Sequence, residues 1–418
     1  MKRLYLTGGA IILTLILVLI LVFSCTRNKE PDAIIILPGI MGSDLFLAEQ
    51  AVYDGDVYPA DTKLWIDIDS VRKIFKTAEH IRMLAPENNF NIRPDAPVIN
   101  DLKTLGNYGA MNTYGVLYKQ IYSQFHDTCD VILYNYDWRE DPYETARKLD
   151  RFISERDYQS VSFVAHSMGG LVASHYFAMG KTQRSKVNTF LSLGTPYLGS
   201  EQASNAMLTG NISGFIANVF ISDEIRNICP KLDSMYALLP YEHLWRSSLA
   251  VYDLTGSDRS LSFEDEEHLL EEFAQGYSQK QHDTAKRNKE LLFTEKGKHI
   301  SELVNSYYLA GDGQETVSVI NLPKIAELSN TLSTTSKTSS GDGTVSLYSA
   351  TVAGTLPKKR TFIKSEDKKS KSSHDSLADG SDISTMDFII EVLKGNADKM
   401  SDSDLERKYN IRRASNDK

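Results

Sequence analysis

A serine at residue 167 lies in a setting that would make it a nucleophile. Residues 161–165 form a short apolar run that predicts a buried strand, and apolar residues with helical spacing begin at Leu171. Between them, "HSMGG" would form a sharp turn with the serine at its apex. Such a turn packs backbone against backbone, so small residues are needed on both sides, where Ala165 and Gly169 stand. The pattern therefore predicts attack by the Ser167 hydroxyl on a carbonyl carbon.

The same turn would supply part of an oxyanion hole. It directs the backbone N–H of Met168, at the start of a helix, toward an oxyanion that forms beside the serine. A second donor is expected after residues 33–37, a buried strand that leads into the Gly-rich turn "PGIMGS". We predict that the backbone N–H of Ile40 is this donor. The alternative is that "PG" only turns the chain.

The nucleophile needs a base and an acid. A strand, a sharp turn and a helix with serine at the apex form the nucleophile elbow of an α/β-hydrolase, whose order along the chain is serine, acid, histidine. Of the nine histidines, only His374 follows both candidate acids, so this order selects His374 as the base. Two "GDG" turns compete to supply the acid: Asp312 directly follows a strand predicted over residues 303–310, and Asp342 lies in "GDGTV". The acid would hold the imidazole tautomer and stabilise the imidazolium.

Strands and helices alternate through most of the chain. This alternation predicts a mostly parallel sheet flanked by helices, with an inserted cap. The further predicted strands are residues 130–134, 187–193 and 360–364, and the predicted helices are residues 112–126, 143–155 and 383–395.

The predicted domain organisation splits the catalytic core into two parts. The core comprises residues 26–200 and 301–397, and residues 331–340 within it read as a polar loop. Residues 201–300 show no strand alternation and stand where this fold carries a cap, so we expect a helical cap or lid there. An amphipathic lid would suit a lipid substrate, and the alternative is a cap without lipid contact. Residues 398–418 are charged and read as a polar tail.

Several motifs together resemble those of the lecithin:cholesterol acyltransferase and phospholipid:diacylglycerol acyltransferase family. They occur in the family's order as "ILPGIMGS", "LWIDI", "YNYDWR", "AHSMGG", "GTPYLGS" and "GDGTVSLYS", followed by His374 with Leu377. "AHSMGG" and "GTPYLGS" are also similar to motifs of bacterial triacylglycerol lipases, whereas "YDWR" is the most specific. Two positions depart from the family pattern: Ala165, where glycine or serine is usual, and Ser346, where proline is frequent.

The resemblance implies a function and a set of site residues. It assigns Asp342 as the acid and the N–H groups of Ile40 and Met168 as the oxyanion hole. It implies a serine-dependent acyl-ester hydrolase or acyltransferase that acts on lipid esters through an acyl-Ser167 intermediate. No motif selects water, a sterol or a glyceride as the acyl acceptor. The alternatives are an esterase or peptidase with a non-lipid substrate, or a non-catalytic surface lipoprotein.

The N-terminus reads as an export signal of a bacterial envelope protein. Lys2 and Arg3 precede an apolar run over residues 10–23, and "VFSC" then resembles a lipobox that ends at Cys25. We expect lipidation of Cys25 and attachment to a membrane through this anchor. An uncleaved signal anchor or plain secretion are the alternatives, and all three place the folded part outside the cytoplasm.

Composition excludes some functional classes. The chain has 418 residues and a net charge of −9, without a basic patch interleaved with aromatic residues, so nucleic acid is not an expected partner. The three cysteines form no CxxC motif and no His/Cys cluster, so no metal site is expected. The predicted chemistry needs no cofactor.

Overall fold

The computed structural model describes most of the chain beyond its first 30 residues. The described residues are 31–65, 71–95, 98–99, 114–210, 218–241, 252–254, 263–322, 334–338, 340–367 and 370–414. The predicted export signal and Cys25 lie outside these ranges. Among the helices within them, none is both long enough and apolar enough to cross a membrane.

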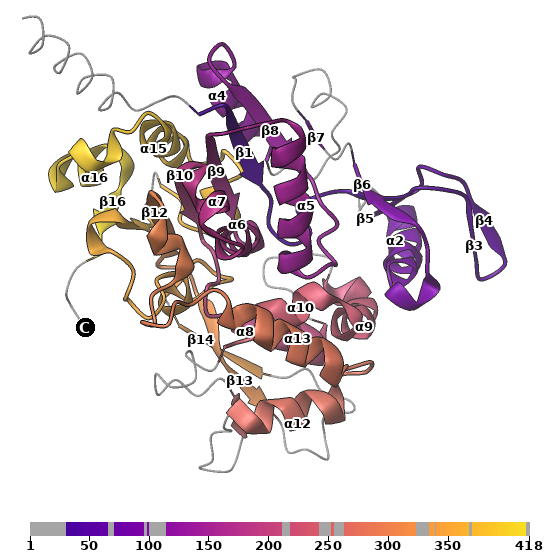
Figure 1. Ribbon diagram of the computed structural model, residues 1–418. Helices are drawn as coiled ribbons and strands as arrows, with labels where there is room; N and C mark the ends of the chain where they lie inside the picture. The colour runs from indigo at the N-terminus through magenta and orange to yellow at the C-terminus, as the bar shows by residue number, and fades with distance from the viewer. Residues whose placement is uncertain are drawn as a thin grey trace, which may run out of the picture.

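An eight-stranded sheet forms the centre of the molecule, in the order β16-β15-β12-β10-β9-β1-β8-β7 (Figure 1). Its strands are β1 Ala33–Leu37, β7 Val98–Ile99, β8 Asp130–Tyr134, β9 Val161–His166, β10 Val187–Leu193, β12 Ser306–Asp312, β15 Thr361–Ser365 and β16 Ile411–Arg413. The strands from β15 to β8 run parallel, and β7 and β16 pair antiparallel at the two ends. The predicted mostly parallel sheet is therefore present.

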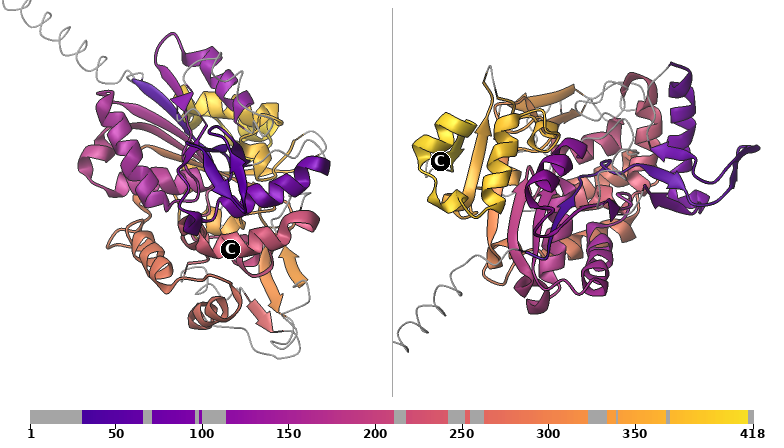
Figure 2. Two further views of the ribbon diagram at one scale, coloured as in Figure 1. Left: turned by 90° about the vertical axis from the view of Figure 1, so that its right-hand side faces the viewer. Right: turned by 90° about the horizontal axis from the view of Figure 1, so that it is seen from above.

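Helices cover both faces of this sheet. The flanking helices are α4 Gly115–Phe125, α5 Pro142–Glu155, α6 Met168–Ala178, α7 Lys181–Ser185, α15 Ile383–Leu393 and α16 Asp402–Tyr409. Because side chains alternate along a strand, Ile35 and Leu37 of β1 pack with α5 and α6, whereas Ile34 and Ile36 pack with α4 and α15. In the right-hand view of Figure 2 the yellow C-terminal helices lie on one side of the molecule. Burial of both faces explains why β1 reads as a continuous apolar run.

A smaller three-stranded sheet follows β1 in the chain. Its central strand is β2 Leu45–Leu47, which pairs with β5 Lys63–Trp65 and β6 Ile92–Pro94. Helix α2 Val71–Met83 lies beside it. A hairpin of β3 Ala51–Tyr53 and β4 Asp56–Tyr58 projects from the body of the molecule (Figure 1).

The cap gathers below the sheet in Figure 1 and contains both helices and strands. Its elements are α8 Glu201–Thr209, α9 Asn218–Ile228, α10 Asp233–Leu238, β11 Tyr252–Leu254, α12 Phe263–Phe273, α13 Gln279–Glu290, β13 Thr316–Leu322 and β14 Thr334–Thr338. The helix α14 Leu347–Ala350 follows.

Two predictions about the cap are wrong. The cap predicted over residues 201–300 is not purely helical, because β11 pairs with β13. The polar loop predicted over residues 331–340 contains β14, which pairs antiparallel with β13, so the cap also takes residues from the predicted second part of the core. The sequence of β14, "TTSKT", has no apolar alternation, but threonine is β-branched and suits a strand.

The prediction of a polar tail over residues 398–418 is also wrong. Helix α16 and strand β16 belong to the folded core, and β16 extends the sheet beside β15. A buried charge helps to hold them, since the Lys364 ammonium donates to Ser384 Oγ at 2.6 Å and to the Tyr409 carbonyl. The same ammonium lies 3.5 Å from the Asp382 carboxylate, and both side chains are almost fully buried. These polar contacts attach the C-terminal segment together with the buried side chains of Leu405, Tyr409 and Ile411.

We predict that Asp382→Asn destabilises the fold. Asparagine can still accept the N-capping hydrogen bond from the Thr385 N–H, but it removes the nearest countercharge of the buried Lys364 ammonium. Breaking a buried pair in this way should lower the free energy of unfolding by roughly 3 kcal/mol, measured by denaturant unfolding. The double variant Lys364→Met/Asp382→Asn should lose less than the single variant. Wild-type stability of Asp382→Asn would contradict this account.

Candidate active site

Ser167 occupies the sharp turn between β9 and α6. Its backbone has φ 53° and ψ −128°, an unfavourable conformation for a residue with a side chain. Two backbone hydrogen bonds hold it there: the Ser167 N–H donates to the Leu193 carbonyl, and the Gly170 N–H donates to the Ser167 carbonyl, both at 2.9 Å. The turn predicted from the sequence is therefore a strained elbow at the carboxyl end of a central strand.

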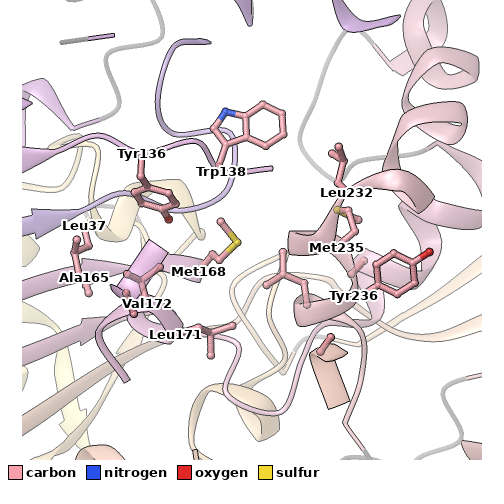
Figure 3. Close-up of a cluster of buried hydrophobic side chains, with 14 of the residues drawn as sticks. Leu37, Tyr136, Trp138, Ala165, Met168, Leu171, Val172, Leu232, Met235 and Tyr236 are labelled. Carbon is pink, nitrogen blue, oxygen red and sulfur yellow. The ribbon is translucent and has the colours of Figure 1, made fainter. Parts of the chain in front are cut away.

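Glycines after the serine allow the elbow to pack closely. A Cβ on Gly169 would lie 2.4 Å from the Leu37 carbonyl oxygen, at the end of β1. A Cβ on Gly170 would lie 1.9 Å from Thr195 Oγ1, in the loop after β10. Ala165, which replaces the more usual glycine, is fully buried and lies beside Leu37 (Figure 3).

His374 and Asp342 form a buried pair. The imidazole Nδ1 lies 2.7 Å from Asp342 Oδ2, and the His374 backbone N–H donates to the Asp342 carbonyl at 2.8 Å. Gly194 makes room for the pair, since a Cβ there would lie 3.0 Å from the carboxylate and 3.2 Å from Nδ1. Because a carboxylate only accepts hydrogen bonds, the proton is on Nδ1 and Nε2 is left as the proton acceptor.

The surroundings of His374 adjust its basicity. Burial alone lowers the pKa of the imidazole, but the negative charge and the hydrogen bond of Asp342 outweigh it, and the pKa is raised above the usual 6.5. The ring of His374 lies 4.6 Å from the ring of His166, the neighbour of Ser167. Among the described residues no hydrogen bond joins the Ser167 hydroxyl to His374, a bond that often tightens only when substrate is bound.

The two candidate acids lie next to each other in space. After β12 the chain leaves the core through β13 and β14, and it then returns beside its starting point. There the Gln314 N–H donates to the Gly341 carbonyl at 3.0 Å, and a Cβ on Gly311 would lie 2.7 Å from the Asp342 Cβ. The Asp312 carboxylate instead lies 3.2 Å from Arg412. The structure thus brings Asp342, and not Asp312, into contact with the histidine.

The loop after β1 is fixed by aromatic side chains. Three of them donate to its backbone carbonyls: Trp65 to Met41 at 3.0 Å, Tyr136 to Pro38 at 2.6 Å and Trp138 to Ser43 at 3.0 Å. Tyr136 and Trp138 belong to the "YNYDWR" motif, whose contribution to this loop sequence reasoning missed. The Ile40 N–H has no acceptor among the residues that the structure describes.

Met168 begins α6, so its N–H has no acceptor within the helix. Its side chain belongs to the same buried hydrophobic cluster as Met235 of the cap (Figure 3). A cavity of about 80 Å³ lies between core and cap, lined by Ile40, Ser167, Ala203 and other mostly apolar residues. Among the described residues no acceptor is found for the Ile40 or the Met168 N–H, and both residues lie beside the serine. Within the described part of the chain, no three His, Cys, Asp or Glu side chains form a metal-binding group.

The family model for lecithin:cholesterol acyltransferase matches residues 125–379. The chain belongs to the lecithin:cholesterol acyltransferase family. The matched range contains Ser167, Asp342 and His374, and the predicted family resemblance is confirmed. A lipid-acting hydrolase or acyltransferase is the activity class that this family indicates.

A solved structure shows the same fold. A chain in the crystal structure of the Tle4–Tli4 complex is 14% identical with a TM-score of 0.60, and the match covers 90% of this chain and 100% of that one. The Bacillus licheniformis lipase BlEst2 in its mature form is 14% identical with a TM-score of 0.38, over 87% and 92% of the two chains. No curated protein sequence matches significantly. The predicted α/β-hydrolase fold is confirmed for this member of the lecithin:cholesterol acyltransferase family.

We predict that the two glycines of the elbow respond differently to alanine. Gly170→Ala should lower the free energy of unfolding by about 1–3 kcal/mol, because its methyl group would overlap the Thr195 side chain. Adding Thr195→Ala should recover part of this loss. Gly169→Ala meets the backbone of Leu37, so Thr195→Ala should not rescue it. Equal rescue of both variants in denaturant unfolding would contradict the packing described here.

Proposed function

We propose that this family member is a serine-dependent acyl-ester hydrolase or acyltransferase that acts on lipid esters through an acyl-Ser167 intermediate. The observation that supports it most strongly is the buried His374–Asp342 pair close to a strained elbow that presents Ser167. In this proposal Asp342 rather than Asp312 is the acid, because only Asp342 contacts the base.

The proposed reaction has two acyl-transfer steps. His374 Nε2 takes the hydroxyl proton as Ser167 Oγ attacks the ester carbonyl, and the N–H groups of Ile40 and Met168 stabilise the oxyanion. The tetrahedral intermediate collapses, the ester C–O bond breaks, and the leaving alcohol receives the proton from His374. Water or an acceptor alcohol then gives a proton to His374 and attacks the acyl carbonyl. The bond between the acyl group and Ser167 Oγ breaks, Oγ receives the proton from His374, and a fatty acid or a new ester is released.

An apolar lining supports a lipid as the acyl donor. The cavity at Ser167 is bounded by apolar side chains of the cap, including Met235 and Leu238, which suit an acyl chain better than a polar group.

We also propose that the N-terminal segment exports the protein and anchors it to a membrane through Cys25. Such an anchor would keep the enzyme at a lipid surface.

The products formed from lipid vesicles test the proposed function. Protein that begins at Thr26 is incubated with phospholipid and triacylglycerol vesicles, with or without a long-chain alcohol or a sterol, and products are identified by mass spectrometry. Free fatty acid alone indicates a lipase, and esters of the added alcohol indicate an acyltransferase.

Ser167→Ala should reduce turnover by roughly 10⁴- to 10⁶-fold. More than a tenth of wild-type activity in that variant would exclude Ser167 as the nucleophile, and turnover of a short p-nitrophenyl ester alone would exclude the lipid substrate.

The pH dependence tests the acid. His374 must be neutral to accept a proton, so activity should fall as the pH falls through its pKa, which Asp342 raises above 6.5. In Asp342→Asn the charge is lost while burial remains, so the midpoint of this acid limb should move to lower pH. The maximal rate should drop by roughly 10⁴-fold. Asp312→Asn is the matched control, and the assignment is wrong if only that variant is inactive.

A further inference from the structure

A chain of three hydrogen bonds runs behind the site, from the loop after β1 to the base. The Gly39 N–H lies 2.8 Å from the Tyr114 hydroxyl oxygen. The same hydroxyl lies 2.8 Å from His166 Nδ1, and His166 Nε2 lies 2.9 Å from the backbone carbonyl oxygen of His374. Four segments that are distant in the sequence are thereby connected through two side chains.

The direction of each bond follows from the chemistry of its two ends. The His374 carbonyl only accepts, so His166 carries its proton on Nε2, and its Nδ1 is then an acceptor. Tyr114 must therefore donate to Nδ1, while its oxygen accepts from the Gly39 N–H. Every donor in the chain has an acceptor, and one tautomer of His166 satisfies all of them.

Burial holds the two side chains in these protonation states. Burial and the neighbouring His374 lower the pKa of His166 well below its usual value, although the hydrogen bond to the His374 carbonyl opposes this. Burial raises the pKa of Tyr114, so it retains its hydroxyl proton. A neutral His166 has one N–H, which is the number that the chain of hydrogen bonds requires.

Both ends of the chain adjoin groups of the proposed mechanism. Gly39 immediately precedes Ile40, and a Cβ at Gly39 would lie 2.8 Å from the Ser167 Cβ and 3.4 Å from His166 Nδ1. At the other end, His374 belongs to a loop rather than to a helix or strand of the core. Its backbone is held by the Asp342 carbonyl and by His166.

We propose that Tyr114 and His166 are positioning residues that keep the oxyanion loop and His374 in a fixed arrangement around Ser167. This role rests on the proposed function, because it has a purpose only if Ser167, Ile40 and His374 take part in acyl transfer. In this proposal neither Tyr114 nor His166 contacts the acyl group. Their loss should therefore impair the chemical step more than substrate binding.

The first test compares Tyr114, which immediately precedes α4, with Tyr118 in the first turns of that helix. Tyr114→Phe removes the acceptor of the Gly39 N–H and the donor to His166, whereas Tyr118→Phe removes a buried hydroxyl that faces the Val131 carbonyl. Tyr114→Phe should lower kcat by about 10- to 100-fold with KM within about twofold of wild type. Tyr118→Phe should retain kcat. Equal kcat values in the two variants would overturn the proposal.

A second variant tests whether the two side chains act together. His166→Gln places an amide that can reach the His374 carbonyl but cannot receive the Tyr114 hydroxyl proton in the same place. It should lower kcat, and adding Tyr114→Phe to it should cost less than Tyr114→Phe costs alone. Independent effects that multiply would overturn the coupled role. If Tyr114→Phe is poorly folded, His166→Gln alone tests the proposal, since wild-type kcat in that variant would overturn it.

Ser167→Ala separates a failure of this inference from a failure of the proposed function. If Ser167→Ala is active, the proposed function is wrong and the positioning role is wrong with it. If Ser167→Ala is inactive but Tyr114→Phe has wild-type kcat, only the positioning role is wrong. Denaturant unfolding of each variant identifies any loss of kcat that follows from a loss of folded protein.

Discussion

Close contact between two backbones is the constraint on which the rest of the site depends. The first turn of α6 lies so near the end of β1 that Gly169 has no room for a side chain beside the Leu37 carbonyl. Since the chain passes from β1 directly into the loop that contains Ile40, this contact places the loop against the elbow. The strained backbone of Ser167 is held by the neighbouring strand β10, so the central strands of the sheet define the nucleophile and the loop beside it.

Buried polar groups complete what backbone packing begins. Loop carbonyls after β1 accept hydrogen bonds from aromatic N–H and O–H groups, which removes the cost of burying them unpaired. The same principle explains the role of the "YNYDWR" motif: the rings of Tyr136 and Trp138 are buried, and their polar atoms fix the loop. A motif outside the proposed chemistry therefore shapes the site.

Sequence reasoning succeeded where local patterns decide the structure. The strands Asp130–Tyr134 and Val187–Leu193 were predicted with their observed bounds, because parallel strands buried on both faces read as apolar runs. It failed where tertiary contacts decide. The polar strand β14 gains its partner only in the cap, and the C-terminal segment is attached through the buried Lys364 and through the packing of Leu405 and Ile411 in the core. The order of serine, acid and histidine selected His374, and the family resemblance assigned Asp342, but no local pattern reveals the excursion of the chain that brings Asp342 back beside the end of β12.

The C-terminal strand β16 also has a consequence for solubility. A sheet with a long exposed edge offers unpaired N–H and C=O groups to other chains, which promotes aggregation. Here β16 has only three residues, pairs antiparallel with β15, and carries Arg412 and Arg413. A short strand with charged side chains is a poor template for the addition of another strand. The segment that sequence reasoning assigned to a polar tail therefore protects the parallel sheet from pairing with neighbouring molecules.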